Sequence, residues 1–353
     1  MKAAVTTGKQ NLELKDRPDP RPGPEEVVVR PGAVGICGTD RHIYRGEYKE
    51  NFPVIMGHEI SGSVLETGNN VKGIEPGDRI AVDPNIYCNS CSYCNQGDVN
   101  HCENLKAVGV TEDGGFAEKL AVPRTNIYRL PEDISAEKAA LTEPLSCVLR
   151  GLDQIDLKAG ERVLIMGGGL IGLMMAAVIR RYYSEKIVVA EPDGYRRDKA
   201  ADFVPAVIDP HQKQPEDFAT NVYQKMERNQ PEVIIEASGS TAALKQGLET
   251  AGKQSRLLIF GVADRESTVD ISPYEIYEKE IEIIGSFLNP FTSSRAVDLI
   301  SRGELELEKL IDLKLSLTEL PSFFAAGEED SKNTENTRQA SYNRYIKAMM
   351  VNQ

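Results

Sequence analysis

The chain has 353 residues, of which 41% are hydrophobic and 27% are charged, and it contains no tryptophan. A chain of this length exceeds what one hydrophobic core comfortably supports, so two domains are expected. The formal net charge of -13 argues against unspecific attraction to nucleic acid or to an anionic membrane, although it says nothing about a local phosphate site.

The first part of the chain, up to about residue 149, has the pattern of short strands broken by glycine and proline. This pattern predicts an all-β domain in the form of a partly closed barrel, with a turn at Pro31-Gly32. The strand candidates are Val27–Arg30, Ile60–Leu65 and Arg79–Val82.

Met1–Val5 begins a strand-like segment without a signal-peptide core, so a cytoplasmic location is expected.

Four cysteines lie in one short segment with the spacing C-x2-C-x2-C-x7-C, at Cys88, Cys91, Cys94 and Cys102. Four thiolates at this spacing match a closed, tetrahedral structural zinc site. An iron–sulfur cluster is the alternative, but the bacterial pattern has a shorter last gap followed by proline, whereas Glu103 follows here. The acidity of the chain disfavours a zinc ribbon that binds nucleic acid.

A glycine turn dominates the middle of the chain, where Val163–Gly172 reads V-L-I-M-G-G-G-L-I-G and the apolar run Leu173–Ile179 follows. A buried strand, a tight turn and a helix fit this order. The glycines have the G-x-G-x-x-G spacing of dinucleotide sites, in which amides at the helix N-terminus face a pyrophosphate. The residues predicted to bind the cofactor here are Gly167, Gly169, Leu170, Ile171 and Gly172.

A second apolar run, Ile187–Ala190, ends at Glu191, close to where such a site has an acid for the ribose hydroxyls. The carboxylate would repel a 2′-phosphate, so NAD is predicted over NADP. Arg196 and Arg197 lie downstream and could instead bind a phosphate. The alternative for the whole region is an ordinary helix-capping turn followed by a surface glutamate.

Further strands are predicted near 206–208, 233–237, 257–260 and 281–284, separated mostly by helical patterns, as in a doubly wound parallel sheet. A late strand near Tyr345–Met350 is expected to rejoin the first domain. The polar segment Glu328–Arg338 is predicted to be a surface loop. The expected domains are therefore 1–149 with 290–353, and 150–289.

Two glycine-punctuated stretches carry Cys37 and His58. Taken singly, each is more often a buried thiol or a core histidine than a metal ligand. Catalytic zinc takes about three protein ligands of nitrogen, sulfur or oxygen type and leaves one position open. A carboxylate from Glu143 could complete such a set.

The sequence resembles the zinc-dependent medium-chain dehydrogenases, the superfamily of the zinc alcohol dehydrogenases, over nearly the whole chain. The family's Cys-Gly-Thr-Asp-x-His stands at Cys37–His42, its Gly-His-Glu at Gly57–Glu59 and its four-cysteine lobe at Cys88–Cys102. The resemblance implies an α/β protein with a GroES-like, partly open β-barrel catalytic domain and a Rossmann domain for NAD. It also implies one catalytic and one structural zinc ion, and a homotetramer or dimer.

The resemblance assigns Cys37 and His58 to the catalytic zinc. The third ligand in polyol dehydrogenases is the glutamate of Glu-Pro-Leu, which is Glu143 here, and Glu59 is a nearby alternate carboxylate. Asp40 would fix the ring and tautomer of His58.

Two further roles, those of Thr39 and Lys347, are implied by the resemblance. Thr39 would pass the proton of the substrate hydroxyl through the cofactor ribose to His42 and then to water. Lys347 aligns with a basic position that meets the pyrophosphate, although an exposed strand lysine is the alternative. Tyr44 would offer a further hydroxyl near the substrate.

The predicted activity is NAD-dependent oxidation of a secondary hydroxyl group flanked by another hydroxyl, in a polyol or sugar derivative. One departure is that Gly285–Asn289 lacks the arginine of many polyol dehydrogenases.

An L-threonine 3-dehydrogenase is the enzymatic alternative, because its Cys-Gly-Thr-Asp-x-His-x-Tyr pattern is present at 37–44. That group tends to carry Asp-Pro-Phe where this chain has Glu-Pro-Leu. A non-catalytic member of the fold is the other alternative, disfavoured by the intact metal-ligand pattern.

Overall fold

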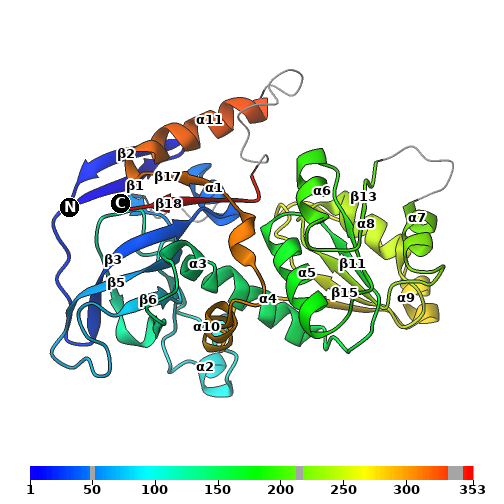
Figure 1. Cartoon of the computed structure of the whole chain (residues 1–353), viewed down its shortest axis with the longest axis horizontal. Helices are drawn as coiled ribbons and strands as arrows, with labels where there is room; N and C mark the ends of the chain where they lie inside the picture. The colour runs from blue at the N-terminus through cyan, green and yellow to red at the C-terminus, as the bar shows by residue number, and fades with distance from the viewer. Residues whose placement is uncertain (48–51, 212–217, 333–344, 353) are drawn as a thin grey trace. The chain divides into compact units, whose positions relative to one another are not determined.

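The computed structural model describes all residues except 48–51, 212–217, 333–344 and 353 (Figure 1). The chain divides into two compact units, one formed by Met1–Ser146 with Pro290–Gln353 and the other by Cys147–Asn289. The first division falls inside helix α4 (Thr142–Gln154), as does the boundary after residue 149 expected from the sequence.

The main sheet of the first unit runs in the order β10-β6-β5-β3-β18-β17, with β9 also paired to β3. Its C-terminal strand β18 lies antiparallel to β3, with Met349 opposite Gly35 (Figure 1). The last strand of the chain therefore completes a sheet begun near the N-terminus. The bounds are β3 Glu26–Gly35, β5 Glu59–Thr67, β6 Arg79–Val82, β9 Leu120–Pro123, β10 Ile127–Arg129, β17 Ile311–Leu315 and β18 Lys347–Val351.

The turn predicted at Pro31-Gly32 is wrong, because β3 continues through both residues. Pro31 lies opposite Gly62 of β5, and the register shifts between Pro31 and Ala33. Proline cannot donate to a strand ladder, so a β-bulge at this point lets the strand continue without that hydrogen bond.

Smaller elements complete the first unit. Strands β1, β2 and β4 form an antiparallel sheet in the order β2-β1-β4. Helix α11 buries Phe324, whose ring lies 5.3 Å from that of Tyr44 and 6.3 Å from that of Phe116. The bounds are β1 Lys2–Gly8, β2 Asn11–Asp16, β4 Val54–Ile55, β7 Asn85–Ile86, β8 Lys106–Ala107, α1 Gly38–Tyr44, α2 Ser92–Gln96, α3 Ala136–Ala140, α10 Ser293–Arg302 and α11 Leu320–Lys332.

The loop predicted at 328–338 is wrong over its first part, because residues 328–332 belong to α11. Glutamate and lysine favour a helix as readily as a polar loop, and the buried Phe324 anchors the preceding turns. Positions 333–338 lie outside the described residues.

The second unit contains a six-stranded parallel sheet in the order β13-β12-β11-β14-β15-β16. Each strand predicted there is present with its ends shifted by at most one residue, so the Rossmann-type prediction is confirmed. All four residues of β11 are buried, as is typical of a parallel sheet with helices on both of its faces. The bounds are β11 Val163–Met166, β12 Ile187–Ala190, β13 Ala206–Ile208, β14 Val233–Glu236, β15 Arg256–Ile259, β16 Glu282–Gly285, α5 Leu170–Tyr182, α6 Gly194–Ala200, α7 Phe218–Lys225, α8 Thr241–Thr250 and α9 Pro273–Lys279.

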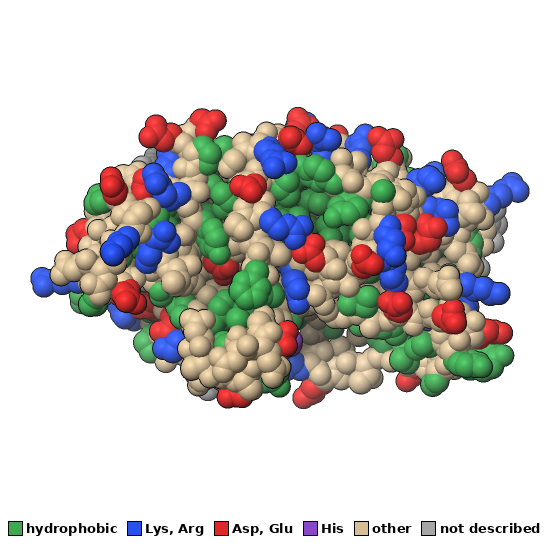
Figure 2. All heavy atoms as spheres, turned by 90° about the horizontal axis from the view of Figure 1, so that it is seen from below, with side chains coloured by type: hydrophobic (Ala, Val, Ile, Leu, Met, Phe, Trp, Pro, Cys, Tyr) green, Lys and Arg blue, Asp and Glu red, His purple; other side chains and the backbone are tan. Residues whose placement is uncertain are grey.

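The surface carries charges of both signs. On the face drawn in Figure 2, acidic and basic side chains are interspersed rather than gathered by sign. No helix in the described part of the chain combines the length and the apolar character needed to cross a membrane.

Candidate metal centres and dinucleotide site

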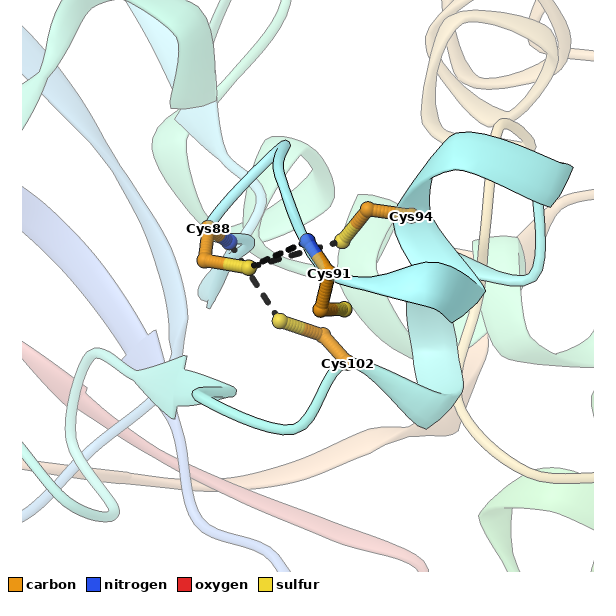
Figure 3. A group of neighbouring side chains, drawn as sticks. All are labelled: Cys88, Cys91, Cys94 and Cys102. Atoms are coloured by element: carbon orange, nitrogen blue, oxygen red, sulfur yellow. Dashed lines mark hydrogen bonds between the residues drawn. The ribbon is translucent and has the colours of Figure 1, made fainter.

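The four cysteines of the 88–102 segment converge on one point (Figure 3). Their sulfur atoms all lie within 4.8 Å of one another, and Cys88 Sγ is 3.9 Å from Cys94 Sγ. Local turns bring them together, since Cys91 is the N-cap of α2 and Cys102 ends a 3-10 turn at Val99–His101. Four sulfur donors around one point are the ligand set of a closed zinc site.

The protein alone does not hold these four sulfurs in one ionisation state. Hydrogen bonds from Ser90 and from the backbone of Cys91 lower the pKa of Cys88 to about 5. Burial and the neighbouring thiols raise the pKa of Cys94 to about 12. Thiolates packed together repel one another, so a divalent cation is what would allow all four to ionise.

A second group of ligand atoms forms where the N-terminus of α1 meets the start of β5. One ligand atom each from Cys37, His58 and Glu59 lies within 4.8 Å of the other two. Cys37 is half-buried at the N-cap of α1, while His58, just before β5, and Glu59, its first residue, are buried. The group offers sulfur, nitrogen and oxygen donors, a combination that zinc accepts.

Asp40 holds the two halves of this group together. It is fully buried, and its carboxylate accepts the backbone N–H of Cys37 at 2.8 Å and that of Gly57 at 3.2 Å. Its Oδ1 lies 3.5 Å from His58 Nδ1. Burial alone would lower the pKa of His58, but the Asp40 carboxylate and the Cys37 sulfur raise it well above the ordinary value. With Nδ1 facing Asp40, the other ring nitrogen is the one suited to a metal.

Glu59 is paired with Lys347, and both side chains are 2% exposed. Lys347 Nζ also donates to the backbone oxygen of Ile36 at 2.9 Å. Gly35 lies opposite Glu59 in the β3–β5 ladder, and a Cβ on Gly35 would meet both charged side chains. The buried position rules out the exposed strand lysine considered from the sequence. The pyrophosphate contact of Lys347 stays a prediction.

The other predicted active-site residues have distinct surroundings. Thr39 Oγ1 lies 3.9 Å from Cys37 Sγ. His42, three residues further along α1, is 40% exposed and places Nδ1 2.5 Å from Glu47. Glu143 is half-buried in the first turn of α4, and its carboxylate is outside the two groups of ligand atoms found among the described residues. Its role as a zinc ligand stays a prediction.

The prediction that Tyr44 offers a hydroxyl near the substrate is wrong, because the residue is buried in the core. Its hydroxyl donates to the backbone oxygen of Gln10 at 3.1 Å, and the residue is 4% exposed. The ring packs on Phe324, so Tyr44 belongs to the core of the first unit. The sequence spacing placed Tyr44 two residues after His42 but could not show that it lies on the opposite, core-facing side of α1.

The glycine turn has the geometry expected for a dinucleotide site. Gly167 has φ 110°, a conformation that side-chain-bearing residues rarely adopt. Gly169 is the N-cap of α5, so Leu170 and Ile171 open the helix, and the buried Gly172 lies in its first turn. The N–H groups of a first helical turn have no acceptor within the helix and can bind an anion.

Glu191 lies beside this turn at the carboxyl end of β12. Its two oxygens accept the backbone N–H groups of Gly168 at 2.7 Å and Asp193 at 2.9 Å. Arg196 approaches the turn as well, with its Nη1 3.7 Å from where a Cβ on Gly169 would be. Arg197 is directed elsewhere, since it donates to the backbone oxygen of Glu191 at 2.9 Å and lies 3.2 Å from Asp209.

Sequence reasoning missed a second buried carboxylate next to the glycine turn, that of Glu236. This residue ends β14, is 2% exposed, and accepts the N–H groups of Ser238 at 2.7 Å and Gly239 at 3.0 Å. An acid that ends an apolar run and precedes Ser-Gly was the available signal.

Comparison with known proteins places the chain in a family. Residues 23–132 match the alcohol dehydrogenase GroES-like domain, and residues 169–302 match the zinc-binding dehydrogenase domain. D-arabinitol dehydrogenase 1 from Uromyces fabae is 32% identical over 81% of this chain and 82% of its own. The chain belongs to the zinc-type medium-chain alcohol dehydrogenases. It is therefore an oxidoreductase, and the resemblance inferred from the motifs is confirmed.

Two other members of the family bear on substrate and cofactor. L-threonine 3-dehydrogenase from Pyrococcus horikoshii is 36% identical over 86% of this chain and 87% of its own. The crystal structure of a protein assigned as a zinc-binding dehydrogenase from Sinorhizobium meliloti, bound to NADP, has a TM-score of 0.91 and 34% identity, covering 99% of both chains. Family membership thus leaves open which alcohol and which nicotinamide cofactor this dehydrogenase uses.

Proposed function

We propose that the chain is a zinc- and NAD-dependent dehydrogenase that oxidises a secondary hydroxyl group of a polyol or sugar derivative to a ketone. The observation that carries the proposal is the convergence of Cys37, His58 and a buried carboxylate beside the N-terminus of α1. A purely structural protein of this fold would have no use for a mixed sulfur, nitrogen and oxygen group of this kind.

Two zinc ions fit the donors available. The four sulfurs of Cys88–Cys102 would hold a structural ion, and Cys37, His58 and either Glu59 or Glu143 would hold a catalytic one. A bound catalytic ion would polarise the substrate hydroxyl as a Lewis acid and lower its pKa. Three protein ligands leave a position open for that oxygen.

Residues of α1 supply the remaining functions. Asp40 fixes the orientation of His58 through its position beside Nδ1. Thr39 and His42 are three residues apart on one helix, so their side chains project from the same face. The resemblance assigns both residues to a relay that would carry the substrate proton to water, and the partial exposure of His42 suits the last step of such a relay.

NAD is the proposed cofactor. The buried carboxylate of Glu191 would accept hydrogen bonds from ribose hydroxyls and repel a 2′-phosphate. We expect kcat/KM with NAD to exceed that with NADP by about tenfold or more, since the repulsion between two like charges, the Glu191 carboxylate and the 2′-phosphate, costs about a factor of ten or more in binding. Steady-state rates at matched substrate concentration test this. Equal efficiency with both cofactors would mean that Arg196, near Gly169, accommodates the extra phosphate.

The substrate class follows from Glu143, the carboxylate that the Glu-Pro-Leu pattern suggests as the third zinc ligand. Oxygen is a harder zinc ligand than sulfur, and a carboxylate can move aside to admit a second substrate oxygen. A vicinal diol benefits from that freedom, whereas a simple primary alcohol does not. We expect a polyol to exceed its deoxy analogue in kcat/KM by about tenfold or more, the effect of one lost charge-assisted contact. Ethanol or butanol matching the best polyol would contradict the diol proposal.

L-threonine is the second candidate substrate, because a threonine 3-dehydrogenase is 36% identical over 86% of the chain. Its reacting hydroxyl group is flanked by an amine rather than by a second hydroxyl. The same assays with L-threonine and NAD decide between the two. A rate with threonine above every polyol would replace the polyol assignment and leave the dehydrogenase assignment intact.

We also infer that the enzyme forms a homo-oligomer, with the small-molecule substrate as its other partner. Strand β16 is at the edge of its sheet, and most of its residues are exposed. Ile283 and the nearby Phe287 are 39% and 51% exposed, and Tyr277 of α9 is 80% exposed. An apolar edge strand invites pairing with a second copy about a two-fold axis. A mass in solution equal to one chain would contradict this.

A further inference from the structure

Glu191, which the proposed function assigns to the adenosine ribose, is bonded to the glycine turn itself. Its Oε2 accepts the N–H of Gly168 at 2.7 Å, and its Oε1 accepts that of Asp193 at 2.9 Å. The residue is 4% exposed, and a Cβ on Gly168 would lie only 3.1 Å from its Cγ. The carboxylate is therefore part of the structure of the turn.

Two consecutive amides join the turn to β12. Gly167 donates to the backbone oxygen of Ala190 at 2.8 Å, a bond that would form whatever the side chain at 190. Gly168 donates to the side chain of Glu191, a bond that needs an acceptor of this length and position. Strand β12 is in turn paired along its length with β11 and from Val188 to Ala190 with β13, so it is a fixed support.

The peptide that Glu191 holds lies immediately before the amides assigned to the pyrophosphate. Gly168 precedes Gly169, the N-cap of α5, and the N–H groups from there onward are those without an acceptor inside the helix. Rotation of the Gly168 peptide would change the path of the chain into α5. A lost Glu191 carboxylate would thus disturb pyrophosphate binding without touching the pyrophosphate.

The neighbouring strand supports this interpretation. Glu236 ends β14 on the other side of β11, and its carboxylate binds the amides of Ser238 and Gly239. Ser238 in turn packs against Gly167, with its Cβ 3.0 Å from where a Cβ on Gly167 would be. Both strands that flank β11 thus end in a buried carboxylate that fixes a loop through backbone N–H groups.

We propose that Glu191 is a positioning residue for the cofactor pyrophosphate in addition to a contact for its ribose. The inference rests on the proposed dinucleotide function and deepens it. The two roles are compatible, because a carboxylate offers about four acceptor positions and the two backbone bonds use two of them. A residue that served only to select NAD would have no effect on a ligand without ribose hydroxyls.

The test compares ADP with 2′,3′-dideoxy-ADP, which keeps the diphosphate but lacks both ribose hydroxyls. Isothermal titration with the full chain gives the affinity of wild type, Glu191→Ala and Glu191→Gln for each ligand. We expect Glu191→Ala to weaken the binding of dideoxy-ADP by about tenfold or more, because a charged acceptor of two N–H groups is lost. The affinity of Glu191→Gln for dideoxy-ADP should lie between those of wild type and Glu191→Ala. Its amide oxygen can accept one of the two N–H groups, whereas its NH2 group can accept neither.

The matched control is Glu185→Ala, an exposed acid before the opposite end of β12, which should leave both affinities unchanged. If Glu191→Ala binds dideoxy-ADP as tightly as the wild type does but binds ADP more weakly, the positioning role is overturned and the dinucleotide function still stands. If Glu191→Ala does not fold, the same comparison with Glu191→Gln decides. A wild-type chain that binds neither ADP nor NAD would overturn the proposed function and this inference together.

Discussion

Replacing His58 by alanine is expected to lower kcat/KM by a factor on the order of 10³ or more, because the substituted chain cannot hold a catalytic zinc ion. His58 is 6% exposed, lies beside Asp40, and belongs to the only mixed-donor ligand group among the described residues. Steady-state rates with NAD and the best polyol measure the loss.

The control for this substitution is His211→Ala, because His211 is exposed and belongs to the second unit. That variant should keep the rate of the wild type. Far-UV circular dichroism should show that His58→Ala remains folded, since the imidazole adds no backbone hydrogen bond to β5. A His58→Ala variant that turns over at the rate of the wild type would refute the proposed catalytic metal.

Replacing Cys91 by serine is expected to destabilise the first unit by an amount on the order of several kcal/mol, because a structural zinc ion contributes folding free energy directly. The segment that holds the four sulfurs contains only short elements, including α2 at Ser92–Gln96 and the 3-10 turn at Val99–His101. Without the metal, little apolar packing would hold these turns together. Thermal unfolding measures the effect.

Cys147→Ser is the matched control, because Cys147 lies outside both groups of ligand atoms in the described chain. It removes a thiol without removing a proposed metal ligand, so its unfolding temperature should change less than that of Cys91→Ser. Equal unfolding temperatures for Cys91→Ser and wild type would argue that the four cysteines hold no structural ion.

The sequence predicted the second unit closely because its central strands β11, β12 and β14 are fully buried. Val163–Met166 and Ile187–Ala190 are continuous apolar runs with glycine or an acid directly after them, and both boundaries match. Local patterns were less informative in the first unit. The bulge at Pro31 depends on pairing with Gly62, which lies on a distant strand.

In the candidate site, too, the sequence predicted the local features and missed the contacts between distant segments. The cysteine lobe and the glycine turn are local in sequence, so spacing alone identified their members. The pairing of Glu59 with Lys347 joins β5 to β18, with β3 between them, and no periodicity in either segment indicates it. Spacing likewise placed Tyr44 near the substrate, whereas the aromatic contact with Phe324 of α11 places it in the core.

The zinc content per chain tests the central claim most directly. Metal analysis of purified wild type, His58→Ala and Cys91→Ser should give about two, one and one zinc ions per chain, because each substitution empties a different site. Of the three, His58→Ala should lack turnover although its structural ion remains. Wild type with a single ion, or His58→Ala with two ions, would contradict the account of a separate catalytic centre at Cys37, His58 and a carboxylate.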